Sequence, residues 1–537
     1  MAKIIQYFQK SLLGAILFVF CVNCNDQIKY SDNLVFRYNE HKNINSLDPA
    51  FAKDKANIWA VNQLFNGLVQ MNDSMKVIPS IAKKWEISDD QKLYKFYLRD
   101  DVFFHSHSNF GPNKTRAVNA SDFDYSFRRI INPKLASPGA WVFNSVKNFK
   151  VIDDHTFQIE LKYPFAAFLE LMTMKYCSVV PKEVIEDNGQ KFRNSPIGTG
   201  PFFFKKWDEN IKLVFRKNKR YFEIDGDGNK LPYLEAVSIT FLPEKQLEYS
   251  QFLQGKLDFV SGMDASYKDD ILTKGGNLNP KYEKKIKMIK SDYLNTEYLG
   301  FYLDSYQDDR NHILLRKAFN FGFDRNKMMK YLRNNIGKPA FGGIIPKGLE
   351  GHQEKIGYKY NPIKAKKLVE KYKSISKNNS PSFTIATTEN YLSICEFIQR
   401  SLLDIGIIIK INVMPASALK SAKANGKTDV FRASWIADYP DAQNYLSLFY
   451  SDNLAPRGPN YTHFKNIKFD SLYELAIKEK NEFNRYEFYK KLDQMIVEEA
   501  AVVVLYYDEV VRLAQKNIKN LSINPTNLLN LKYLRKI

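Results

Sequence analysis

The one run of sequence apolar enough to meet a membrane, residues 11–22, lies at the extreme N-terminus of this 537-residue chain. A protein that crosses a membrane many times is therefore excluded. The chain is much longer than a single hydrophobic core usually supports, so we expect two or three domains. Its 44% hydrophobic and 26% charged residues are typical of globular proteins.

The N-terminal segment has the order of an export signal. Residues 1–10 carry two lysines and precede the apolar run. A Cys that ends such a run resembles the lipobox of bacterial lipoproteins, in which this Cys becomes the acylated N-terminus. We identify Cys24 as the lipid attachment residue. Cys21 is the alternative, because Asn23 before Cys24 is larger than the usual residue.

The cysteines and the net charge narrow the function classes further. Four Cys in the whole chain exclude a disulfide framework. The Cys21–Cys24 pair straddles the expected cleavage site, so we expect no redox chemistry from it, and we expect Cys177 and Cys395 to be small buried residues. The net charge of +20 is spread along the chain and not gathered into a patch, which argues against a nucleic-acid-binding protein.

Helical and strand patterns are intermingled throughout. Apolar spacing predicts helices over residues 58–68 and 391–405, and strands over 92–98, 407–413 and 500–507. Such mixing predicts an α/β protein with mixed sheets.

Motifs for catalysis and cofactor binding are incomplete. Gly198 and Gly200 begin a dinucleotide-binding motif, but Phe203 stands where its third Gly is needed. His105 and His107 could share one face of a strand and hold a metal, but no third ligand is clustered nearby. We therefore expect no enzyme activity, no cofactor and no metal site.

A series of short motifs runs in order along most of the chain. Residues 106–116, which follow the motif at residues 102–105, are expected to form a long loop. The motifs are at residues 46–49 (SLDP), 66–68 (NGL), 78–82 (IPSIA), 85–90 (WEISDD), 96–99 (FYLR), 102–105 (VFFH), 119–123 (NASDF), 125–128 (YSFR), 196–201 (PIGTGP), 228–234 (GNKLPYL), 315–319 (LRKAF), 324–325 (DR), 360–362 (YNP), 365–368 (AKKL) and 435–446 (WIADYPDAQNYL).

Together these motifs resemble the extracytoplasmic solute-binding proteins of ABC transporters, in the family that includes the oligopeptide- and dipeptide-binding proteins. The resemblance implies a two-lobed clam shell, the periplasmic-binding-protein fold, with mixed sheets and a ligand cleft closed at a hinge. One lobe would contain two domains. The implied boundaries are residues 1–24 for the signal peptide; 25–67, 198–300 and 505–537 for the core of lobe 1; 68–197 for its extra domain; and 301–504 for lobe 2.

The resemblance also implies residues that contact the ligand. In peptide-binding relatives an Asp three residues after a Trp pairs with the ligand's α-ammonium; here these are Asp438 and Trp435. Arg432 matches an Arg that meets the carboxylate of certain peptides. The backbone from Ser434 to Ile436 would lie beside the peptide as an added strand. Further candidates are Trp435 and Trp141 as pocket walls, with core packing as their alternative, and residues 52–55 as a second backbone edge.

The function implied is that of a substrate-binding lipoprotein of an ABC importer. It would capture short peptides on the periplasmic side of the membrane, anchored there by its lipid, and deliver them to separate permease and ATPase chains. We expect a monomer. The alternatives are a non-peptide cargo such as a nickel complex, a sugar or heme, a peptide sensor, or an exported hydrolase.

Overall fold

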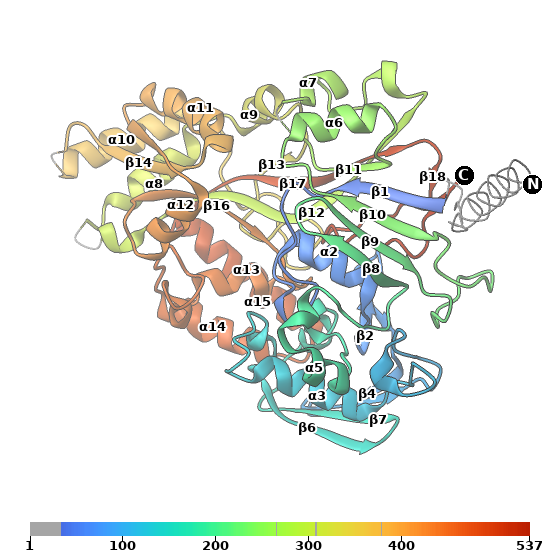
Figure 1. The fold of residues 1–537 in the computed structure, drawn as a ribbon. Helices are drawn as coiled ribbons and strands as arrows, with labels where there is room; N and C mark the ends of the chain where they lie inside the picture. Colours follow the sequence, from blue (N-terminus) through green and yellow to red (C-terminus); the bar gives the residue numbers. More distant parts are fainter. Residues whose placement is uncertain (1–33, 265, 307–308, 377) are drawn as a thin grey trace, which may run out of the picture.

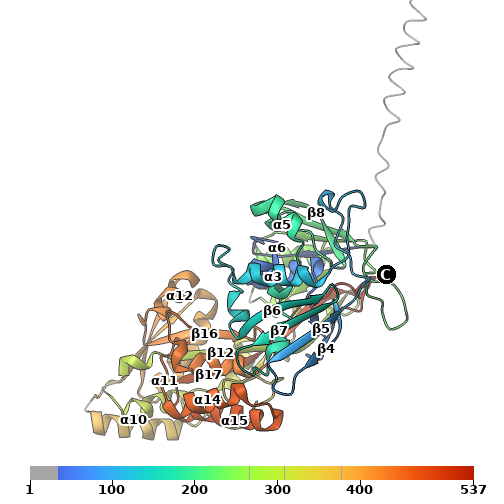
Figure 2. The same cartoon turned by 90° about the horizontal axis from the view of Figure 1, so that it is seen from below.

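The computed structural model describes residues 34–264, 266–306, 309–376 and 378–537. The chain forms two lobes, and Figure 2 shows the helices of one lobe (α10–α12, α14 and α15) apart from those of the other (α3, α5 and α6). The candidate lipid-attachment residues Cys21 and Cys24 lie outside the described residues. No helix among the residues described is long and apolar enough to cross a membrane.

One large mixed sheet passes through both lobes (Figure 1). Some neighbouring strands of this sheet are parallel and others antiparallel: β1 is parallel to β10, whereas β10 is antiparallel to β9. The short strand β13 (Lys338–Pro339) also pairs with β17 and stands outside the strand order given next. The strand order is β15 (Ile408–Val413), β14 (Ser382–Thr387), β16 (Val430–Ile436), β12 (Ile286–Phe301), β17 (Val502–Gln515), β11 (Phe259–Ser261), β1 (Val35–Asn39), β10 (Ala236–Thr240), β9 (Lys212–Lys217) and β8 (Phe202–Asp208).

Two long strands, β12 and β17, connect the lobes. The first part of β12 pairs with the end of β17, from Ile286 opposite Gln515 to Asp292 opposite Glu509. The register then shifts between Asp292 and Thr296, and the later part of β12 pairs with the start of β17. A bulge of this kind bends the strand. We call the bend at residues 293–295, where β12 continues from one lobe to the other, the hinge.

Lobe 2 packs helices around the β14–β16 end of the sheet. Helix α11 (Leu392–Leu403) buries Ile394, Cys395, Ile398 and Leu402, which recur at the spacing of one helix face. Gly406 follows it with a φ of 86°, the left-handed conformation that glycine adopts at little cost. The other helices here are α8 (His312–Phe321), α9 (Arg325–Leu332), α10 (Pro362–Ser376), α12 (Ala416–Ala424), α13 (Gln443–Leu446), α14 (Ile467–Lys478) and α15 (Glu482–Glu498).

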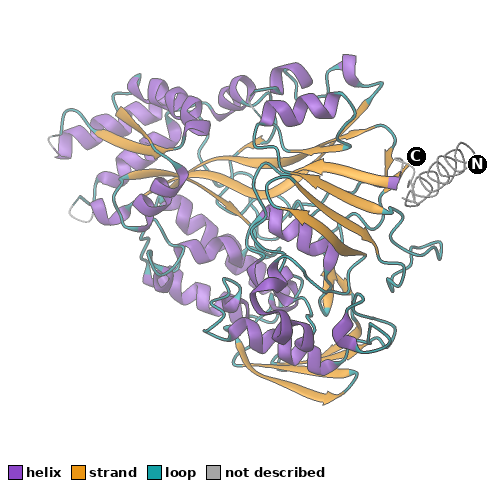
Figure 3. Ribbon diagram, viewed as in Figure 1, coloured by secondary structure: helices purple, strands orange, loops and turns teal. Residues whose placement is uncertain are grey.

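Lobe 1 holds the other end of the large sheet and a separate small domain. In Figure 3 the strands of this small domain lie at the foot of the view with helices above them. Helix α3 (Ala120–Ile131) packs Phe123 and Phe127 against Phe157 of the sheet. The strands of lobe 1 besides the large sheet are β4 (Ala82–Ile87), β5 (Leu93–Leu98), β7 (Thr156–Leu161) and β6 (Val146–Asp153), paired in that order, β2 (Val69–Met71) with β3 (Val77–Pro79), and β18 (Ile518–Lys519) with β19 (Arg535–Lys536). Its α-helices are α2 (Lys55–Leu64), α4 (Phe168–Leu171), α5 (Lys182–Asn188), α6 (Lys245–Leu253) and α7 (Lys268–Ile271).

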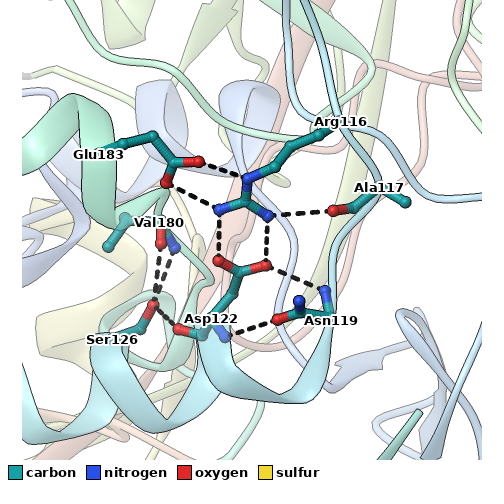
Figure 4. A network of polar contacts seen from close by, with 7 residues as sticks. All are labelled: Arg116, Ala117, Asn119, Asp122, Ser126, Val180 and Glu183. Atoms are coloured by element: carbon teal, nitrogen blue, oxygen red, sulfur yellow. Dashed lines mark hydrogen bonds and ion pairs between the residues drawn. The ribbon is translucent and has the colours of Figure 1, made fainter. Parts of the chain in front are cut away.

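The long loop at residues 106–116 ends in a network of ion pairs (Figure 4). The Arg116 guanidinium donates to both oxygens of Asp122 on α3, at 2.7 and 2.8 Å, and to Glu183 on α5, at 2.5 and 2.8 Å. Asp122 in turn accepts from the backbone N–H of Asn119, which completes a capping box at the start of α3. The loop is therefore fixed to two helices at this end.

The mixed α/β class and the two-lobed fold predicted from the sequence are confirmed. The domain boundaries given above stay a prediction.

His105 is a buried structural residue that joins the small domain to the loop before β8. Its Nδ1 accepts from the backbone N–H of Gly198 at 3.3 Å, and its Nε2 donates to the carbonyl of Gly200 at 3.0 Å. His107 instead caps a short helix by accepting from the N–H of Asn109. Among the described residues, no three His, Cys, Asp or Glu side chains are grouped to hold a metal.

Acid should weaken the fold through His105. Burial lowers the pKa of His105 to about 4, from an ordinary value of 6.5. Its neutral form is kept in the folded state, so the stability it supplies is present above pH 6.5 and is lost as the pH falls from 6.5 toward 4. His105→Gln should lower the free energy of unfolding less at pH 5 than at pH 7.5, by about 2 kcal/mol. Urea unfolding of both proteins at the two pH values measures this; an equal loss at both would contradict it.

Candidate functional site

A cavity of about 400 Å³ lies where the lobes and the hinge meet. Lobe 1 contributes residues 52–55 and part of α2, and the small domain contributes residues 173–176. Lobe 2 contributes residues 436–440, which begin at the last residue of β16, and the hinge contributes Tyr293. Side chains from both lobes therefore meet around one space, the arrangement expected of a ligand site between domains.

Asp438 lies in this cavity on a turn held by Asn444. The Oδ1 atom of Asn444 accepts from the backbone N–H of Asp438 at 3.2 Å and from Nε1 of Trp435 at 2.7 Å. Asn444 is buried, at 4% exposed, so the turn is held from behind by a fixed group. Trp435 thus supports the turn, and it is not among the described residues that line the cavity.

The Asp438 side chain is exposed and lines the cavity. Loss of water raises the pKa of Asp438 above its ordinary value. Hydrogen bonding with the side chain of Asn444 acts in the opposite direction. Among the residues that the structure describes, no cation forms an ion pair with Asp438. A ligand cation held between the lobes beside this carboxylate would form a charge-assisted ion pair that is shielded from water.

Arg432 already has a partner. Its guanidinium donates to the buried carboxylate of Glu297 at 2.6 Å and stacks on the ring of Tyr391, 3.4 Å from the ring centre. The Tyr391 hydroxyl donates to the same carboxylate at 3.2 Å. Neither Arg432 nor Ser434 belongs to the described lining of the cavity, whereas Ile436 does. The role predicted for Arg432 therefore stays untested.

Trp141 lies at the edge of the small domain. Trp141 is 38% exposed, its ring lies 6.4 Å from the ring of Tyr439, and it is not one of the described lining residues. Tyr439 lines the cavity and packs into the hydrophobic core of the small domain. Tyr439, next to Asp438, therefore forms one of the contacts between the lobes.

The cavity also contains two lysines that sequence reasoning did not single out. Lys175 belongs to a short 3-10 helix, η5 (Lys175–Cys177), and Lys532 lies near the C-terminus. The sequence offers no signal for either, because they are two of 79 Lys and Arg residues and neither lies in a recognisable motif.

Known proteins share this sequence and this fold. The family model described as "Bacterial extracellular solute-binding proteins, family 5 Middle" matches residues 76–455. The dipeptide-binding protein DppE of Bacillus subtilis is 25% identical, covering 95% of this chain and 94% of that protein. A dipeptide-binding protein of Escherichia coli is also 25% identical, over 86% of this chain and 87% of its own length.

A solved structure matches over almost the whole chain. It is the ABC transporter-associated periplasmic binding protein DppA of Helicobacter pylori, in complex with the peptide STSA. It is 24% identical with a TM-score of 0.77, and covers 94% of this chain and 98% of that one. This likeness shows the fold, and the family match covers well over half of the sequence. The chain therefore belongs to family 5 of the bacterial extracellular solute-binding proteins, which bind substrates for transport.

Proposed function

We propose that this protein captures short peptides outside the cytoplasmic membrane and delivers them to an ABC permease driven by a separate ATPase. The observation that carries the proposal is the Asp438 carboxylate, which lies in a cavity between two lobes without a cationic partner among the described residues. A peptide's α-ammonium would supply that partner. Relatives named dipeptide-binding proteins, and a fold neighbour in complex with a peptide, support the same cargo.

The backbone beside Asp438 suits an extended ligand. Strand β16 pairs with β12 along all of Val430–Ile436, but β14 pairs only with Val430 and Phe431. Within the described residues, the β14-facing edge from residue 432 to 436 thus has no strand on it. A peptide added there would be bound through main-chain hydrogen bonds, which do not depend on its sequence. Ser434 and Ile436 would contribute in this way, as residues 52–55 would from the opposite lobe.

The cavity volume favours a short ligand, since about 400 Å³ is near the lower end of the roughly 300–1,000 Å³ usual for small-molecule sites. The remaining features of the proposal concern where the protein acts. Acylation of Cys24 would keep a monomeric protein on the periplasmic side of its membrane, close to the permease. It has no catalytic step of its own and needs no cofactor.

A thermal-shift screen of the purified protein tests the cargo. Di- to octapeptides would be added with free and with acetylated N-termini. A ligand at about 100 times its Kd adds roughly 2.7 kcal/mol to the stability, which raises the unfolding midpoint measurably. We expect a shift with free-amine peptides only. If ligand-free protein shifts with none of them, the cargo is not a peptide, and nickel complexes, sugars and heme are screened next.

Loss of peptide uptake in a strain that lacks this protein separates transport from sensing. A peptide sensor would bind the same ligands, so affinity alone does not distinguish the two. Unchanged uptake in that strain, with peptide binding intact, would contradict the transport role.

A further inference from the structure

Lys175 is a cation without a partner in the candidate binding cavity. Its side chain lines the cavity, on η5 of the small domain. No hydrogen bond or ion pair joins its ammonium group to any residue that the structure describes. Burial, together with the nearby ammonium of Lys532, lowers the pKa of Lys175 to about 8. The group is therefore still mostly protonated at neutral pH, although it is poorly hydrated.

The charges around Lys175 do not neutralise it. Three other lysines line the cavity. Lys53 is exposed, Lys55 pairs with Glu40 at 3.6 Å, and Lys532 pairs with Glu223 and donates to Oε1 of Gln70 at 2.9 Å. Glu223 also accepts from the side-chain amide of Gln70 at 3.0 Å. Among the described residues, the Glu223 carboxylate is thus paired with Lys532, and the ammonium group of the half-buried Lys175 stays unpaired.

Asp438 and Lys175 therefore face the same space from different lobes as unpaired charges of opposite sign. The Asp54 carboxylate, which also lines the cavity, instead caps α2 by accepting from the backbone N–H of Asn57 at 3.2 Å. Asp438 comes from lobe 2 and Lys175 from the small domain of lobe 1, and they form no ion pair with each other. A ligand with an ammonium group at one end and a carboxylate at the other would satisfy both. Because the two anchors lie in different lobes, such a ligand would also favour closure of the cleft.

We infer that Lys175 binds a carboxylate of the ligand and so selects short zwitterionic peptides that reach from Asp438 to Lys175. This inference rests on the proposed function. It assigns the carboxylate to Lys175 instead of Arg432, because the Arg432 guanidinium is held by Glu297. A charged hydrogen bond of this kind in a poorly hydrated site is strong and depends on the ionised carboxylate.

The test compares three forms of the tightest-binding free-amine peptide: its free acid, its C-terminal amide, and an amide whose last residue is Glu. Calorimetry gives the affinity of each for wild-type protein, Lys175→Met and Lys175→Arg. We expect wild type to bind the free acid roughly 30-fold or more tightly than the plain amide. Lys175→Met should abolish this preference and Lys175→Arg should keep it. If the Glu amide binds as the free acid does, Lys175 accepts a side-chain carboxylate as well.

Lys423→Met is the matched control. Burial lowers the pKa of Lys423 to about 8 as well, but Lys423 packs on the ring of Tyr461 and is not among the described residues of the cavity. This variant should keep the full preference for the acid. Wild type that binds peptides without preferring the acid, or Lys175→Met that still prefers it, would overturn the inference and leave the proposed function standing. Wild type that binds no peptide at all would overturn both.

Discussion

Asp438→Asn is expected to weaken the binding of free-amine peptides by about 2–5 kcal/mol, the usual effect of removing one partner of a charge pair that is buried in a complex. The substitution keeps the shape of the side chain and removes its charge. N-acetylated peptides have no ammonium group, so their weaker binding should barely change. Calorimetric titration of wild type and variant with paired free and acetylated peptides measures both effects.

Asp441→Asn provides the control on the same turn. The Asp441 carboxylate is buried, its pKa is raised by loss of water, and it accepts from the backbone N–H of Gln443 at 2.8 Å. It is not among the described residues that line the cavity. This variant should bind peptides as wild type does. Equal losses for free and acetylated peptides in Asp438→Asn would show that Asp438 does not hold the ammonium group.

Gly200→Ala is expected to lower the free energy of unfolding by about 3 kcal/mol or more. A Cβ atom at Gly200 would lie 2.4 Å from the carbonyl carbon of Leu64, 2.6 Å from the carbonyl oxygen of Gln63 and 2.7 Å from the nitrogen of Phe65. All three are backbone atoms at the end of α2. The loop is also held in place, because Gly200 donates to Leu64 O at 2.9 Å and its carbonyl accepts from His105 at 3.0 Å. Overpacking that cannot relax is costly.

Urea unfolding of Gly200→Ala and Gly226→Ala measures this cost against a control. A Cβ at Gly226 would have no heavy atom within 4 Å, so its substitution should change stability by no more than about 0.5 kcal/mol. A Gly200→Ala protein as stable as wild type would contradict the close approach of this loop to α2. The Gly198–Gly200 pair, which begins a nucleotide-binding motif in the sequence, thus serves packing beside the cavity.

The sequence predicted those helices and strands in which apolar residues recur at a regular spacing. The helix predicted over residues 391–405 is found as α11 (Leu392–Leu403), and the strand predicted over 407–413 as β15 (Ile408–Val413). The strand predicted at 500–507 is only the first part of β17, which continues to Gln515. The second part of β17 contains Arg512, and an Arg is expected at the surface of a protein. It is fully buried instead, where it donates to the carbonyl oxygens of residues 522, 527 and 528.

The candidate site could be predicted only where a motif marks it. The resemblance pointed to Asp438 and Ile436, which line the cavity, and to residues 52–55 opposite them. It could not reveal that Arg432 faces Glu297, because that contact depends on the pairing register of β16 with β12. Nor could it reveal Lys175, which the fold of the small domain brings to the cavity from a distant part of the chain.

A crystal structure of the protein with a free-amine peptide tests the central claim most directly. We expect the peptide in the cavity between the lobes, with its α-ammonium within about 3.2 Å of the Asp438 carboxylate and its main chain along the edge of β16. A peptide bound outside this cavity, or one whose amino terminus is held by another group while Asp438 stays unpaired, would contradict the account.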